Sequence, residues 1–272
     1  MLKNEHVFLY MYKGVLRYPG GKTRAIATLA NIIEKYKFNV STVISPFIGG
    51  ASFELYLSYA NDSKIIANDK FRPLYLFWHY LQEQPDKLIA RITQLRPLSK
   101  ARFAEIKDDL TNSDVSKMRR AAYYFAVNRS SFSGSTTKGG YSKEAAKSRF
   151  NGNSILRLDT INLDDFTFSN LDFTDFLNDN ENMDTFIFAD PPYYLDENLY
   201  GVDEKFKHKK LCKLMKQRNN WIICYNDCPY IRKLYVDVGT IEEVEWSYSM
   251  NSSKKSNEIV IIRKNGKPAL TT

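Results

Sequence analysis

The chain has 272 residues, of which 43% are hydrophobic and 14% aromatic, so it can bury a full core, which excludes a disordered chain. Its formal net charge of +8 favours a polyanionic partner. The three cysteines and three histidines have no paired metal-ligand spacing, which excludes a disulfide framework and a zinc site.

The apolar run within the first thirteen residues is too short for the hydrophobic region of a signal peptide. No run in the chain approaches the roughly 20 apolar residues that cross a bilayer. We therefore expect no membrane partner and no secretion. The predicted location is the cytoplasm of a bacterial or phage-infected cell, or the nucleus.

The first motif is Arg-Tyr-Pro-Gly-Gly-Lys-Thr at residues 17–23. Gly-Lys-Thr also ends the phosphate-binding loop of nucleotide triphosphatases, but that loop needs a glycine where Leu16 stands, so this class is excluded. A Gly21-Lys22 turn that opens a helix can instead bind the carboxylate of an amino-acid-like ligand.

Short apolar runs separated by helix-like segments predict an α/β sheet, with buried strands at residues 42–45, 64–67, 185–189 and 221–225. Phe47-Ile48-Gly49-Gly50 follows the first run and opens a helix-like segment at 51–59. Glycines there let the backbone approach a ligand, and Asp69, twenty positions beyond Gly49, is spaced to hold ribose hydroxyls.

Residues 73–154 interrupt this alternation and predict a mostly helical insertion between two parts of one domain, residues 1–72 and 155–272. Residues 128–141 are rich in Ser, Gly and Thr and predict a mobile loop. Residues 87–157 hold fifteen Lys or Arg and five Asp or Glu, whereas residues 158–204 hold thirteen acids and no Lys or Arg. Single lysines such as Lys107 and Lys117 fit a solvated helical face, but the whole set indicates a surface for DNA phosphates.

Asp190-Pro191-Pro192-Tyr193 follows the apolar run 185–189 and is the strongest signal in the chain. The exocyclic N6 of adenine is a poor nucleophile because its lone pair is delocalised into the ring. Asp190 and the Pro191 carbonyl can accept hydrogen bonds from the two N–H groups of this amine, because the prolines fix the backbone and remove competing donors. Tyr193 can then stack on the base. After a strand at 221–225, residues 229–235 predict a helix, and alternations at 241–248 and 258–262 predict a closing hairpin.

Together these motifs resemble the Dam-like, D12 class N6-adenine DNA methyltransferases of the alpha group, whose motifs run in the order cofactor binding, target recognition, catalysis. The resemblance covers nearly the whole chain and is carried by residues 18–22, 46–52, 69, 128–129, 190–193 and 221–227. It implies a Rossmann-like α/β sheet that uses S-adenosyl-L-methionine, with residues 73–154 as the target-recognition insertion. It also implies methylation of adenine N6 in double-stranded DNA by base flipping.

The site residues divide into three groups. The catalytic residues are expected to be Asp190, Pro191, Pro192 and Tyr193. Those expected to contact S-adenosyl-L-methionine are Tyr18, Gly21, Lys22, Phe47, Gly49, Gly50, Asp69, Phe173 and Asp190. Those expected to contact DNA are Asn128, Arg129, Phe132, Ser133, Lys138 and Tyr141. The recognition sequence stays open between GATC, CATG and another short palindrome, and a cognate restriction endonuclease is a candidate partner.

Alternative activities are weighed by chemistry. Cytosine C5 methylation needs an attacking thiol after a proline, and no cysteine here follows one. For cytosine N4 methylation, only the leading Asp190 and the motif order argue against it. Enzymes that methylate RNA or protein amides usually begin the turn with Asn. A DNA-binding relative without activity has no reason to keep Asp190, Tyr193, Gly49 and Asp69 together.

Overall fold

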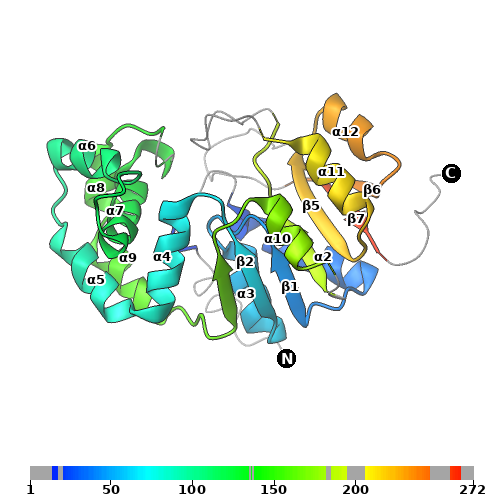
Figure 1. The fold of residues 1–272 in the computed structure, drawn as a ribbon, viewed down its shortest axis with the longest axis horizontal. Coiled ribbons are helices and arrows are strands. Elements are labelled where there is room, and N and C mark those ends of the chain that lie inside the picture. The colour runs from blue at the N-terminus through cyan, green and yellow to red at the C-terminus, as the bar shows by residue number, and fades with distance from the viewer. Residues whose placement is uncertain are drawn as a thin grey trace.

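The computed structural model describes residues 14–17, 21–134, 136, 138–181, 185–194, 206–245 and 258–264. A seven-stranded sheet occupies one side of the molecule and a cluster of helices the other (Figure 1). The strand order is β3-β2-β1-β4-β5-β7-β6; β1 to β5 run parallel, and β7 runs antiparallel to both its neighbours. The strands are β1 (Thr42–Ser45), β2 (Lys64–Asn68), β3 (Phe166–Ser169), β4 (Phe186–Ala189), β5 (Trp221–Asn226), β6 (Thr240–Val244) and β7 (Glu258–Arg263).

The central strands are apolar on both faces because helices cover both. In β4, Phe186 and Phe188 belong to one core, while Ile187 and Ala189 belong to a second core on the opposite face, as alternate side chains of a strand must. The first core includes α2 (Ile26–Tyr36), α3 (Ser52–Asn61) and α4 (Arg72–Glu83), and it continues from α4 into the helical cluster. The second core is covered by α10 (Phe173–Asp179), α11 (His208–Lys216) and α12 (Pro229–Tyr235).

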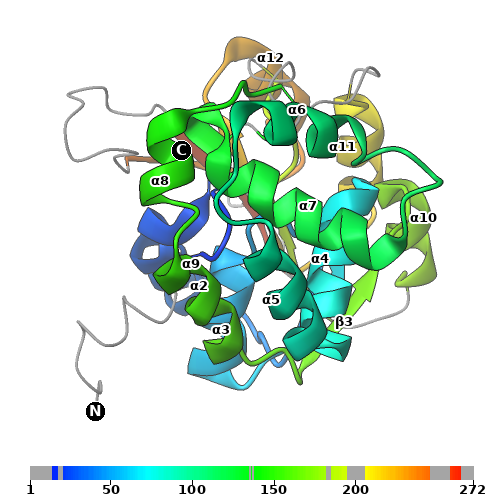
Figure 2. The same ribbon diagram turned by 90° about the vertical axis from the view of Figure 1, so that its left-hand side faces the viewer.

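The helical cluster is built around α7 (Lys117–Ser130), whose residues from Ala121 to Asn128 are all buried. A helix that is buried all round needs neighbours on every side. Helix α4 packs on α7 and also on β3, so it joins the cluster to the sheet (Figure 2). The remaining helices are α5 (Pro85–Gln94), α6 (Lys100–Asp108), α8 (Lys143–Ser148) and α9 (Gly152–Leu156), with 3-10 turns η1 (Lys22–Arg24), η2 (Phe132–Gly134) and η3 (Arg157–Thr160).

The expected α/β sheet and its helical insertion are confirmed. The four predicted strands are present, α12 covers the predicted residues 229–235, and β6 and β7 pair antiparallel, as predicted for the closing hairpin. Strand β3 was not predicted. The predicted loop at 128–141 is wrong at its start, because residues 128–130 form the last turn of α7. A separate domain role for residues 73–154 stays a prediction.

Within the described ranges, no helix combines the length and apolarity that a membrane span requires. The same part of the chain holds no cluster of His, Cys, Asp and Glu that could bind a metal ion.

Candidate functional site

Three of the predicted motifs lie at the carboxyl ends of neighbouring parallel strands. The loop Pro46 to Gly50 follows β1, Asp69 follows β2 and Asp190 follows β4. The chain leaves β1 toward β2 on one side and reaches β4 on the other, so the crevice between β1 and β4 is a topological switch point. In open α/β sheets, ligands bind at such a point.

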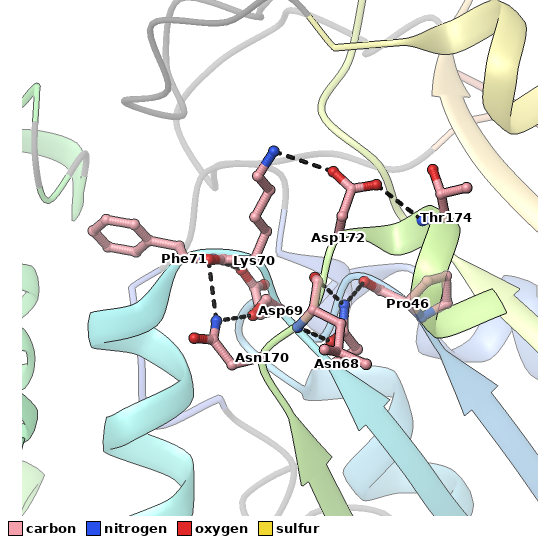
Figure 3. A network of polar contacts seen from close by, with 9 residues as sticks. Pro46, Asn68, Asp69, Lys70, Phe71, Asn170, Asp172 and Thr174 are labelled. Carbon is pink, nitrogen blue, oxygen red and sulfur yellow. Dashed lines mark hydrogen bonds and ion pairs between the residues drawn. The ribbon is translucent and has the colours of Figure 1, made fainter. Parts of the chain in front are cut away.

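The buried side-chain amide of Asn68, at the end of β2, links the segments that follow β1 and β3 (Figure 3). The side chain of Asn68 donates to the carbonyls of Pro46 and Leu171, at 3.2 and 3.1 Å, and its oxygen accepts from the Leu171 backbone N–H at 2.8 Å. Asn170 donates to the Asp69 carbonyl at 2.7 Å. These bonds satisfy polar groups that would otherwise be buried unpaired, so the loops around Asp69 are fixed before any ligand binds.

Asp69 is held by two backbone donors. One carboxyl oxygen accepts from the N–H of Gly49 at 3.3 Å and the other from the N–H of Phe71 at 2.9 Å. Gly49 has a positive φ of 46°, a conformation that favours glycine, and its carbonyl accepts from the indole of Trp78 at 3.0 Å. Burial raises the pKa of Asp69 to about 6, with the two backbone bonds opposing the shift, so the carboxyl is ionised at neutral pH.

An aromatic wall lies beside this loop. The ring centroid of Phe47 is 5.7 Å from that of Phe173 and 5.5 Å from that of Phe206, and Phe173 and Phe206 are 5.2 Å apart. The sequence pointed to Phe47 and Phe173 but not to Phe206, which precedes α11 and adjoins no recognised motif. Such a wall suits a flat ring next to the Asp69 carboxylate.

Asp190 forms a close ion pair. The Lys22 ammonium donates to both carboxyl oxygens at 2.7 Å, and the two side chains are 3% and 24% exposed. Burial by itself lowers the pKa of Lys22, but Asp190, with Cys224 and Glu258, together offset this and leave the pKa raised. Burial also raises the pKa of Asp190, and the Lys22 charge opposes it only in part. The structure therefore pairs Lys22 of η1 with Asp190, and the expected contact of Lys22 with the cofactor stays a prediction.

Tyr193 is buried and anchored by a residue that the sequence did not single out. Its hydroxyl donates to Glu258 on β7 at 2.5 Å, and the Lys22 ammonium lies 5.0 Å from its ring centroid. Glu258 is 3% exposed. The only hint in the sequence was an acid at the start of an otherwise apolar run. A second buried acid, Glu54, accepts from Ser45 at 2.7 Å, and burial raises its pKa to about 7.

Asn128 and Arg129, expected on a loop, lie in the last turn of α7 and bond to backbone groups of the protein, and their contact with DNA stays a prediction. Asn128 is fully buried, accepts from the backbone N–H of Arg17 at 2.8 Å and donates to the Arg17 carbonyl at 2.7 Å. Arg129 donates to the carbonyls of Arg149 and Val15, at 2.9 and 3.3 Å. Burial, followed by the charge of Arg17, lowers the pKa of Arg129 to about 10.

The other expected DNA contacts differ in exposure. Phe132 is 69% exposed and Lys138 is exposed, while Tyr141 is partly buried and donates to the Leu98 carbonyl at 3.0 Å. Ser133 lies in η2.

Of the remaining expected residues, Gly21 precedes η1, Gly50 is buried at the end of the β1 loop, and Pro191 and Pro192 link Asp190 to Tyr193. Tyr18 lies outside the described residues.

Comparison with known proteins gives one result. The model of the D12 class N6 adenine-specific DNA methyltransferase family matches residues 18–250, a range that contains all three strand ends and the helical cluster. No curated protein matches the chain.

Proposed function

The chain belongs to the D12 class N6 adenine-specific DNA methyltransferase family and methylates adenine N6 at specific sites in DNA, and from this premise we propose that Asp190 is its catalytic acceptor. The observation that carries the proposal is the position of Asp190 at the end of β4, across the switch point from the Gly49 loop. This geometry brings a carboxylate and a ligand-binding loop to the same crevice.

Asp190 and the Pro191 carbonyl act on the adenine amine by accepting hydrogen bonds from its two N–H groups. Accepting them draws the nitrogen toward tetrahedral geometry and frees its lone pair, and a carboxylate is the stronger acceptor for this purpose. Methyl transfer then requires no covalent intermediate on the protein. The amine afterwards loses a proton, and no separate base is assigned here.

Lys22 occupies the position that an incoming amine needs. Its ammonium donates to both oxygens of Asp190 and lies over the face of Tyr193, as an adenine amine stacked on that ring would. Lys22 therefore favours the ionised form of Asp190 and hydrogen-bonds it before DNA binds, and it gives up at least one Asp190 oxygen when the base enters. Glu258 orients Tyr193 for that contact through its hydroxyl.

The family uses S-adenosyl-L-methionine, which supplies a methyl group on a sulfonium when bound. The side chains beside the β1 loop fit it: we assign the ribose hydroxyls to the Asp69 carboxylate, which can accept their hydrogen bonds, and the cofactor ring to Phe47 and Phe173. Gly49 and Gly50 provide close backbone approach. Tyr18, Gly21 and Lys22 remain candidates for its amino-acid end.

The target adenine leaves the duplex to reach Asp190, because the base lies inside the stack. Phe132 is the best candidate to fill the gap, since it is aromatic and 69% exposed. Ser133 adjoins Phe132 in sequence and Lys138 follows six positions later, whereas Asn128, Arg129 and Tyr141 hold the surrounding backbone through their hydrogen bonds. A restriction endonuclease that cuts the same site is the proposed partner.

Sequencing of plasmid DNA after incubation with the protein and labelled cofactor tests this function. We expect label on adenine N6 within one short sequence. Arg119→Ala, a substitution on the exposed side of α7, is the matched control and should methylate the same sites. Label on cytosine, or no label with a folded protein, would contradict the proposal.

A further inference from the structure

The helical cluster carries an open pocket of about 520 Å³ at the start of α7, and its lining is cationic. Arg72, Lys117 and Arg120 line it together with Ser113, Val115 and Ser116. No Asp or Glu is among these described lining residues. No aromatic side chain is among them either. The pocket therefore offers positive charge and hydrogen-bond donors to an anion, but no surface on which a base could stack.

Arg120 is the unusual member of this set. The residue is only 7% exposed, and its Nε has no hydrogen-bond partner within the part of the chain that the structure describes. A buried N–H without an acceptor is costly, because it has lost its water without gaining a partner. The pocket that Arg120 lines is where an acceptor can reach it.

Two helices begin at the same pocket. Helix α7 has 14 residues, no acid in its first turn and an N-cap, Ser116, whose side chain makes no capping hydrogen bond. Helix α4 has 12 residues and begins at Arg72, and the two helices pack side by side (Figure 2). The first N–H groups of a helix and its dipole both favour an anion.

We propose that this pocket binds a phosphodiester group of the DNA backbone, with Arg120 donating from the buried side and Arg72 and Lys117 from the exposed side. DNA is the favoured source because Arg72 follows Asp69 by three residues, so the pocket begins at the carboxyl edge of the sheet, the same edge that carries Asp190. The source rests on the proposed function. A phosphate contact sets register and affinity rather than sequence preference.

The salt dependence of DNA binding tests the proposal. Binding of the full chain to a cognate and a scrambled duplex is measured by fluorescence anisotropy over a range of salt, for Lys117→Ala and Arg120→Met. Each variant should weaken binding to both duplexes by the same factor. The plot of log K against log salt should become shallower, its slope losing roughly 0.9 in magnitude for one lost phosphate contact. Arg119→Ala is the matched control, because Arg119 is exposed on the same helix and does not line the pocket.

Thermal unfolding separates a ligand site from a structural role. Without DNA, Arg120→Met should raise the melting temperature, because it removes a buried Nε–H that lacks an acceptor. A structural arginine would give the opposite result, a lower melting temperature with an unchanged salt slope, and that outcome overturns the proposal. Equal slope changes in Arg119→Ala and Lys117→Ala would also overturn it, since the effect would then be general electrostatics.

Inorganic phosphate distinguishes the sources of the ligand. If phosphate, compared with chloride at equal ionic strength, stabilises the wild type but not Arg120→Met while the DNA slopes stay equal, the site binds a free anion and the DNA assignment is wrong. None of these measurements needs methyl transfer. If the wild type fails to methylate DNA but Lys117→Ala and Arg120→Met still give shallower salt slopes than the wild type, the proposed function is contradicted and the phosphate site stands.

Discussion

Replacing Lys22 with methionine removes the cation from a buried ion pair and leaves its partner behind. The Lys22 side chain is 3% exposed and that of Asp190 is 24% exposed, so the remaining carboxylate lies largely out of water. Breaking such a pair from one side costs about 3–5 kcal/mol of unfolding free energy. We expect the lower part of this range, because Asp190 keeps some solvent contact.

The assay is urea unfolding followed by circular dichroism, with two reference variants. Lys70→Met breaks the Lys70–Asp172 pair, whose side chains are 57% and 32% exposed, and should cost no more than about 1 kcal/mol. The double variant Lys22→Met, Asp190→Asn removes both charges and should recover most of the lost stability.

The pH dependence has a definite sign. Burial raises the pKa of Asp190 in the folded protein, so folding favours the protonated form and stability declines as pH rises from 3.8 through the folded pKa. Without Lys22 that pKa rises further, so Lys22→Met should lose little stability near pH 4 and the most near pH 8. The raised pKa of Lys22 supplies stability that is present below 10.5 and lost as pH rises through its folded value. A loss independent of pH, or no larger than that of Lys70→Met, would refute the buried pair.

Three further substitutions test other parts of the site. Asp69→Ala should weaken binding of the demethylated cofactor by about 1.5–3 kcal/mol in calorimetry and leave DNA affinity unchanged. The affinity of the wild type for this cofactor should fall as pH drops through about 6, where Asp69 becomes protonated. A cofactor affinity that Asp69→Ala leaves unchanged would assign Asp69 a structural role. Phe132→Ala should slow methylation of a matched duplex much more than of one whose target adenine is mismatched, with less base flipping by 2-aminopurine fluorescence; equal slowing would argue against gap filling. Glu258→Ala should cost about 1–3 kcal/mol by leaving the Tyr193 hydroxyl unpaired and should lower kcat, while Glu258→Gln restores both; failure of the rescue would mean that the hydrogen bond is not the cause.

The sheet and its loaded strand ends were predictable because their signals are local. An apolar run followed by Gly49 or by Asp190-Pro191 carries both the strand and its functional turn in a few consecutive residues. Strand β3 escaped notice because Phe166 and Phe168 alternate with Thr167 and Ser169 inside an acidic stretch, whose charge indicated solvated surface. Its pairing with β2 depends on residues one hundred positions away, which no local pattern records.

The partners of the polar residues were not predictable for the same reason. Asn128 is buried because its amide satisfies the backbone of Arg17, 111 residues earlier. Lys22 and Asp190 are 168 residues apart, and Tyr193 is 65 residues from Glu258. Sequence identified the chemical groups, whereas the fold decides which of them meet.

Methyl transfer by Asp190 variants tests the central claim most directly. Asp190→Ala and Asp190→Asn are measured in single turnover on plasmid DNA, with folding checked by circular dichroism and cofactor binding by calorimetry. We expect no detectable adenine methylation by the alanine variant and severe impairment of the asparagine variant, because neither supplies the carboxylate that accepts hydrogen bonds from N6. Near-wild-type transfer by either variant would contradict the central claim.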